Sequence, residues 1–209
     1  MRGSPACPRC GGYVEPPGPW TSAWSCAAHG DVHPLQPVCR PTADGLAVVV
    51  RAARVPVWLP WPLPDRWLVT GFAYAGDEHT GARACAVACS GPAPLGGPGE
   101  MVLVAEEPGV GLGATYAGLP GPDPGEGFGG GAPHAKLHIR GHPAPLWSID
   151  SGSDRAVFVG EAMGQWLWAV LWPAAAGVLF LERVELTDLR DAGHELDLPY
   201  GALSPRIAM

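Results

Sequence analysis

Three cysteines and one histidine near the start of the chain have the spacing of zinc ligands. Two residues separate Cys7 from Cys10, and two separate Cys26 from His29 after the intervening residues 11–25. A C-x2-C … C-x2-H pattern is typical of a zinc ribbon, because each short turn directs both side chains at one ion. Three thiolates and one imidazole complete a tetrahedron. The pattern therefore predicts a structural Zn²⁺ with no open coordination position.

Glycine follows each half of this pattern. Gly11 comes directly after Cys10, and Gly30 comes directly after His29. Glycine gives the backbone the freedom to reverse after a ligand, and it lets backbone amides approach the thiolate sulfurs. The agreement between the two halves favours a metal site over a chance cluster or a disulfide.

The fourth ligand is open between His29 and two nearby residues, His33 and Cys39. We favour His29 because its spacing mirrors the first half of the pattern. A segment of forty residues buries little apolar surface, so we expect the metal to supply most of its folding free energy, about 10–16 kcal/mol in comparable peptides.

Two further groups of reactive side chains are weaker candidates. His134, His138 and His142 recur at every fourth residue, which allows a second metal site, but solvated histidines are the default interpretation. Cys85 and Cys89 share one face of an expected strand among small apolar residues. This setting favours buried free thiols over a nucleophile, so the sequence predicts no catalytic residue.

A glycine-rich segment and a tryptophan stripe each have two interpretations. Gly109–Gly113 follows an expected strand and hints at a phosphate loop, but it lacks the full nucleotide-binding pattern and a glycine turn is preferred. Trp166, Trp168 and Trp172 lie in one apolar run. We expect core packing, with an exposed aromatic platform as the alternative.

These residues are expected in an α+β, β-rich fold. The sequence divides into a zinc ribbon at 1–40, a connector at 41–66 and a globular domain at 67–209. The globular domain is expected to be mostly antiparallel, with one or two short helices, because apolar runs of strand length alternate with turn residues. Gly and Pro together make 55 of the 209 residues, which favours turns over long helices.

Within this division, Leu46 and Val49 share one face of a short helix that Thr42 caps, followed by an extended proline-rich segment up to Pro64. The expected strands of the third part are Trp67–Ala75, Arg83–Ser90, Met101–Ala105, Ala135–Ile139, Leu146–Ile149, Ala156–Met163, Gln165–Trp172 and Val178–Leu189.

Composition narrows the classes of partner. The net charge is −7, and no basic face of the kind that neutralises phosphates is evident, so nucleic acid is disfavoured. The longest apolar run, Trp166–Leu181, is shorter than a membrane-spanning helix, which needs roughly 20 residues. Six cysteines without a signal peptide suggest a reducing compartment and a metal role. We therefore expect a cytoplasmic protein without a membrane partner.

Several strings along the chain resemble an uncharacterised family of actinobacterial proteins. They are CPRCGG, CAAHGDVHPLQPV, VPVWLPWPLP, ACSGPAPLGGPGE, VLVAEEPGVGLGA and LTDLRDAG. The resemblance implies a cytosolic protein with a zinc-ribbon-like head and a body of unknown function. It supplies no catalytic residues.

Two functions follow from these patterns. The first is a non-enzymatic zinc-binding protein that acts as a protein-interaction or regulatory module, with another protein as its partner. The second is a small-molecule-binding protein or small enzyme with its pocket in the β-rich domain. The closed zinc pattern and the missing catalytic motif favour the first.

Overall fold

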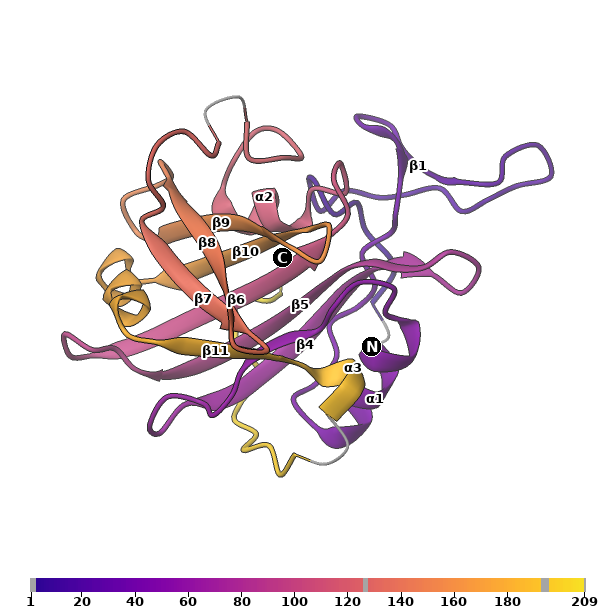
Figure 1. Ribbon diagram of the computed structural model, residues 1–209. Helices are drawn as coiled ribbons and strands as arrows, with labels where there is room; N and C mark the ends of the chain where they lie inside the picture. Colours follow the sequence, from indigo (N-terminus) through magenta and orange to yellow (C-terminus); the bar gives the residue numbers. More distant parts are fainter. Residues whose placement is uncertain (1–2, 126–127, 193–195, 209) are drawn as a thin grey trace.

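The computed structural model describes residues 3–125, 128–192 and 196–208 and is rich in β-strands (Figure 1). A two-stranded sheet joins β1 (Trp24–Cys26) and β2 (Gly30–Val32). The second sheet has nine strands in the order β3 (Trp58–Pro60), β11 (Val184–Asp188), β7 (Ala135–Ile139), β8 (His142–Ile149), β9 (Ala156–Ala162), β10 (Gln165–Trp172), β6 (Pro98–Glu106), β5 (Gly81–Pro92) and β4 (Leu68–Asp77). The helical segments are α1 (Ala43–Ala52), α2 (Leu112–Ala117), the 3₁₀-helix η1 (Ala174–Leu181) and α3 (Leu189–Ala192).

The larger sheet is mixed but almost entirely antiparallel. Strands β7 and β11 form its one parallel pair among the described residues. The sheet curls, so that β3 at one edge approaches β5 and β6 (Figure 1). The predicted class, a β-rich α+β fold with few short helices after a small head, is confirmed.

Both faces of the central strands are buried. On β10, Leu167 and Leu171 face the inner core of the curled sheet, whereas Trp168 and Val170 face a second core. Helix α2 and the chain around Leu35 cover this second core. The uninterrupted apolar sequence of β10 therefore reflects cover on both faces, as the pattern predicted.

The segment between the head and the strands is packed against the body. Thr42 Oγ1 accepts a hydrogen bond from Gly45 N at 3.1 Å and caps α1, whose Leu46 and Val49 are buried in the inner core. The proline-rich stretch contributes β3, which pairs with β11. The helix and the extended segment both form as predicted, and the three-part division stays a prediction.

One predicted strand is wrong in its first half. Val178–Leu189 was expected to be continuous, but η1 runs to Leu181 and β11 begins only at Val184. Pro173 fixes the backbone angle φ before η1, and the small residues 174–177 that follow permit a tight helix. The alternation typical of a half-buried strand starts at Val184, where the ladder also starts.

None of the helices among the described residues is long and apolar enough to cross a membrane.

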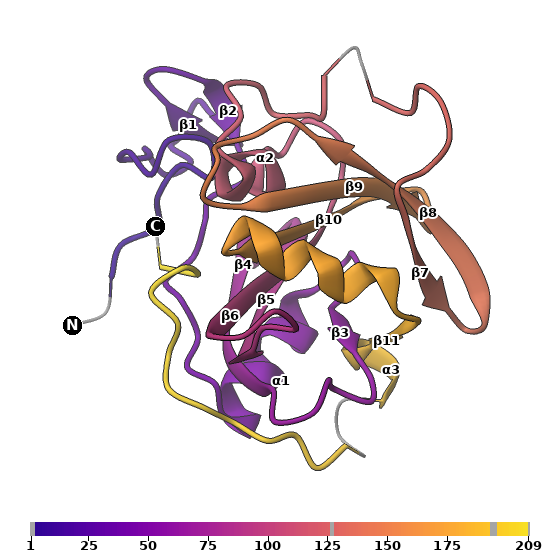
Figure 2. The same cartoon turned by 90° about the vertical axis from the view of Figure 1, so that its left-hand side faces the viewer.

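The head projects from one end of the curled sheet and lies beside α2 (Figure 2). This position brings the residues of the predicted zinc pattern close to the body.

Candidate metal centre

The structure brings Cys7, Cys10, Cys26 and His29 together. One ligand atom from each residue lies within 4.8 Å of the ligand atoms of the other three. The Sγ atoms of Cys10 and Cys26 are 3.9 Å apart, and Nδ1 of His29 lies 3.5 Å from Sγ of Cys7 and 3.6 Å from Sγ of Cys26. These four residues lie close enough to bind a metal ion.

The three separations given above fit a tetrahedral ion. Metal–sulfur bonds near 2.3 Å and metal–nitrogen bonds near 2.0–2.1 Å give tetrahedral edges of about 3.8 Å between sulfurs and about 3.6 Å between sulfur and nitrogen. The sulfur–sulfur and sulfur–nitrogen distances given above are within about 0.1 Å of these values. The donor set and its geometry therefore agree, and a fifth protein ligand is not needed.

The two ligand turns form as the glycines predicted. Gly11 N donates to Cys7 O at 2.8 Å, and Cys7 N donates to Gly12 O at 2.8 Å, which closes the first turn. Gly11 has a φ of +68° and Gly30 a φ of +66°. Only glycine adopts these left-handed conformations without strain, so both glycines are needed where the chain reverses.

Local surroundings shift the pKa values of two thiols, Cys7 and Cys26, in opposite directions. Burial raises the pKa of Cys7 to about 11. The backbone amide of Ala28 and the side chain of His29 stabilise the Cys26 thiolate and lower its pKa to about 6. Cys26 is therefore the thiol that reaches the metal-binding thiolate form most readily.

The head has a small apolar core of its own. Cys7, Val14, Cys26 and Val32 are buried there, and Trp24 packs partly against them. Two of the four buried side chains are ligand cysteines. The head thus lacks the apolar burial that usually holds a domain of this length together.

The first ligand turn also fastens the head to the body. Arg9, between Cys7 and Cys10, donates through Nη2 to Gly109 O and through Nε to Val110 O, the latter at 3.3 Å. Thr115 Oγ1 in α2 donates to Pro8 O at 2.8 Å. The contacts depend on the conformation of the turn, because all three use Pro8 or Arg9, the residues between the ligands.

The glycine-rich segment that receives Arg9 is not arranged to bind phosphate. Its amides are already engaged: Gly109 N donates to Asp123 Oδ1 at 2.8 Å, and Leu112 N and Gly113 N donate to Glu106 at 2.7 and 3.2 Å. Glu106 is fully buried. The glycine turn is therefore favoured over the phosphate loop at Gly109–Gly113, because the side chains of Asp123 and Glu106 already accept these amide hydrogen bonds.

Other predicted candidates lie outside the cluster. Cys39 is on a segment that pairs with Phe72, and His33 borders a separate hollow between head and body. Of the described residues, only the four ligands form a group of three or more side chains able to hold a metal. A second metal site at His134, His138 and His142 is thus not supported.

The cysteines and tryptophans of the body belong to the core. Cys85 and Cys89 are free thiols with 1% of their surface exposed, as predicted, and burial raises the pKa of Cys89 to about 12. Trp168 is completely buried, and Trp172 is 5% exposed. Trp166 donates from Nε1 to Asp123 at 2.9 Å. The exposed-platform interpretation of the stripe is wrong, because both faces of β10 are covered.

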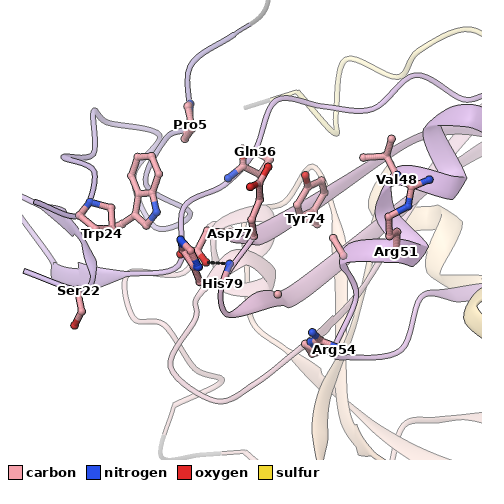
Figure 3. A pocket seen from close by; sticks show the side chains of 14 residues that line it. Pro5, Ser22, Trp24, Gln36, Val48, Arg51, Arg54, Tyr74, Asp77 and His79 are labelled. Atoms are coloured by element: carbon pink, nitrogen blue, oxygen red, sulfur yellow. Dashed lines mark hydrogen bonds between the residues drawn. The ribbon is translucent and has the colours of Figure 1, made fainter.

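Two hollows between the head and the rest of the chain could not be predicted from the sequence. A cavity of about 1060 Å³ lies between Trp24 of the head and Arg51 of the connector and Tyr74 of the body, among other residues (Figure 3). A smaller cavity of about 380 Å³ lies beside it, next to His33 and Arg9. Residues distant in sequence form both cavities.

Comparison with known proteins gives a family. Residues 1–207 match the sequence model described as "Family of unknown function (DUF6758)", and the protein belongs to this family. No curated protein and no solved structure matches the chain. The resemblance to an uncharacterised family is confirmed, and an actinobacterial origin stays a prediction.

Proposed function

We propose that this protein is a non-enzymatic zinc-binding protein in which Cys7, Cys10, Cys26 and His29 hold one structural Zn²⁺, and whose zinc-stabilised head serves protein interaction or regulation. The observation that carries the proposal is that three sulfurs and one imidazole nitrogen lie within 4.8 Å of one another, close enough to bind one ion. When bound, the ion supplies four bonds that hold the two ligand turns together.

The donor set supports a structural role over a catalytic one. Four protein ligands fill the coordination shell, so no position remains for a water or a substrate. The four-residue apolar core of the head supports the same role, because metal binding then contributes most of the folding free energy of residues 1–40. We treat residues 41–66 as the connector and 67–209 as the body.

The free cysteines support a reducing compartment. All six are free thiols, and three of them belong to the cluster. Cytosolic proteins keep their cysteines reduced and commonly use them as metal ligands. We therefore propose the cytoplasm as the location.

A pocket inside the β-rich body, as a small-molecule-binding protein or small enzyme would need, has less support. Large buried side chains such as Phe72, Leu103 and Leu171 fill the inner face of the curled sheet. The hollows described above lie instead where the head meets the body. This location favours an interaction that depends on both parts.

Metal content tests the proposal. The full-length protein is purified without a metal-chelating column, dialysed, and measured by plasma mass spectrometry and native mass spectrometry. We expect about one zinc per chain in the wild type. Cys10→Ser should lose most of it, because a serine hydroxyl is a poor replacement for a thiolate ligand.

Cys39→Ser is the matched control, since it removes a thiol outside the cluster. It should retain the zinc of the wild type. A wild-type protein without stoichiometric metal, whose Cys7 and Cys26 react freely with iodoacetamide under native conditions, would refute the proposal.

A further inference from the structure

The larger hollow between head and body has walls of different chemistry. Trp24 and Pro5 of the head form one side, and Tyr74 of the body and Arg51 and Arg54 of the connector line the other (Figure 3). Arginine and large aromatic residues are the side chains that most often dominate protein recognition. The hollow thus combines apolar surface with two arginines, and two acidic residues, Asp77 and Glu78, also line it.

We propose that this hollow binds a short peptide segment of a partner protein, which places an acidic side chain on Arg51 and Arg54 and an adjacent aromatic or proline residue between Trp24 and Tyr74. The inference rests on the proposed function, because it names the surface through which the zinc-stabilised head would meet a partner.

The two arginines are available for an anion. Among the described residues, no carboxylate lies within 4.0 Å of either guanidinium. Asp77 and Glu78 line the same hollow, but neither pairs with Arg51 or Arg54. Oδ1 of Asp77 already accepts hydrogen bonds from His79 N and Thr80 N at 2.9 and 2.8 Å. An incoming carboxylate would therefore meet unpaired guanidinium groups, which bind carboxylates through two parallel hydrogen bonds.

Arg54 is held in place by the β4–β5 hairpin. Its backbone N donates to Ala82 O at 3.0 Å, and a Cβ on Gly81 would lie 2.6 Å from Cγ and Nε of Arg54. Gly81 also has a φ of +72°. The glycine therefore both completes the turn and leaves room for the arginine side chain to cross it. Arg51 projects from the last turn of α1.

The aromatic side chains stand on fixed elements. Trp24 is paired with Val32 in the two-stranded sheet, only two residues before the ligand Cys26. Tyr74 lies on β4, where its carbonyl accepts a hydrogen bond from Gln36 N at 2.9 Å. Rigid walls reduce the entropy lost on binding, and the position of Trp24 makes one wall dependent on the metal cluster.

The volume of the hollow and the hydrogen bonds along the edge of β4 indicate how a peptide would bind. About 1060 Å³ lies at the upper limit of small-molecule pockets, which span roughly 300–1,000 Å³. The outer edge of β4 is already paired, because Gly76 N donates to Pro34 O and Phe72 exchanges hydrogen bonds with Cys39. A peptide would therefore be recognised through its side chains and not as an added strand.

Selection from a phage-displayed library of random octapeptides tests the inference. The bait is the full-length wild-type protein, with its metal content measured on the same preparation. We expect enrichment of Asp or Glu next to Trp, Phe or Pro. The double variant Arg51→Ala/Arg54→Ala should lose this enrichment. In fluorescence anisotropy with one selected peptide, its Kd should rise about tenfold for each arginine removed.

Two further variants make the result specific. Arg66→Ala/Arg140→Ala removes the same two positive charges from exposed sites elsewhere and should select the same peptides as the wild type. Arg51→Glu/Arg54→Glu should select Lys- or Arg-containing peptides instead, a gain that an unfolded protein would not give.

Three outcomes overturn the inference: no enrichment by the wild type, enrichment without acidic residues, or acidic peptides retained by both variants of Arg51 and Arg54. If stoichiometric zinc accompanies any of these, the proposed metal centre stands and only the peptide site fails. A metal-free protein that still selects acidic peptides through Arg51 and Arg54 supports the site and contradicts the structural zinc.

Discussion

Glu106 is a carboxyl group on which burial and hydrogen bonding act in opposite directions. The side chain is completely buried at the end of β6 and accepts hydrogen bonds from Leu112 N and Gly113 N. Burial dominates and raises its pKa to about 8, the two amides lower it, and the nearby charge of Asp123 raises it further. The folded protein therefore holds a proton on Glu106 near neutral pH.

This shift has a definite sign in a stability measurement. The pKa of Glu106 rises from 4.5 to about 8 on folding. Between these values the folded state binds a proton that the unfolded state has lost, so the free energy of unfolding falls as pH rises. For one group with these two pKa values, the loss between pH 6.5 and pH 8 is about 1.6 kcal/mol.

Glu106→Gln should remove that loss. Glutamine keeps one carbonyl oxygen for a backbone amide, but its NH₂ group faces the other amide without an acceptor. We expect a destabilisation of about 1–3 kcal/mol at pH 6.5 that shrinks as pH rises, because only the wild type weakens with pH. At pH 8 the difference from the wild type should be smaller by about 1.6 kcal/mol.

Urea unfolding followed by tryptophan fluorescence at pH 6.5, 7.25 and 8 measures these differences. Thiol titration in the head contributes equally to both proteins and cancels in the comparison. Glu107→Gln is the control, because Glu107 is half-exposed and pairs with Arg83 at 2.7 Å. The same pH dependence in wild type and Glu106→Gln would refute the assignment of the proton to Glu106.

Two other positions give sharp expectations. Gly113→Ala should destabilise the protein by about 1–3 kcal/mol in urea unfolding, because a Cβ there would overlap the Trp168 ring, whereas Gly121→Ala, with its nearest atom at 3.9 Å, should cost less than about 0.5 kcal/mol. Equal costs would contradict this packing. Cys89 should resist iodoacetamide at pH 8 until the protein is unfolded, and half-exposed Cys39 should react before Cys89, as mass spectrometry of the alkylated peptides would show. Rapid native modification of Cys89 would mean that the inner core opens readily.

The elements that could be predicted are those specified by local sequence. β7 and β10 match their expected ranges, and α1 begins after the predicted cap, because periodicity and turn residues encode strands and helices directly. The segment Val178–Leu181 could not be predicted this way. Its valine and leucines suit a strand equally well, and packing against β9 and β10 decides for η1.

The grouping of Cys7, Cys10, Cys26 and His29 could be predicted for the same local reason, since each turn contains two of them. Where the head sits on the body could not. Arg9 lies between two cysteines and carries no motif of its own. Its side chain nevertheless donates hydrogen bonds to the carbonyls of Gly109 and Val110, about a hundred residues away. Such contacts depend on tertiary position, which a single sequence does not specify.

The same limit explains why the proposed peptide site was missed and what holds it in place. Trp24, Arg51 and Tyr74 come from β1, α1 and β4, and none carries a local motif. Trp24 is linked to the cluster through β1, which ends at the ligand Cys26. If zinc holds the two ligand turns, it also fixes Trp24 opposite the arginines. Loss of metal should then weaken peptide binding without any direct contact between ion and peptide, which connects the two proposals physically.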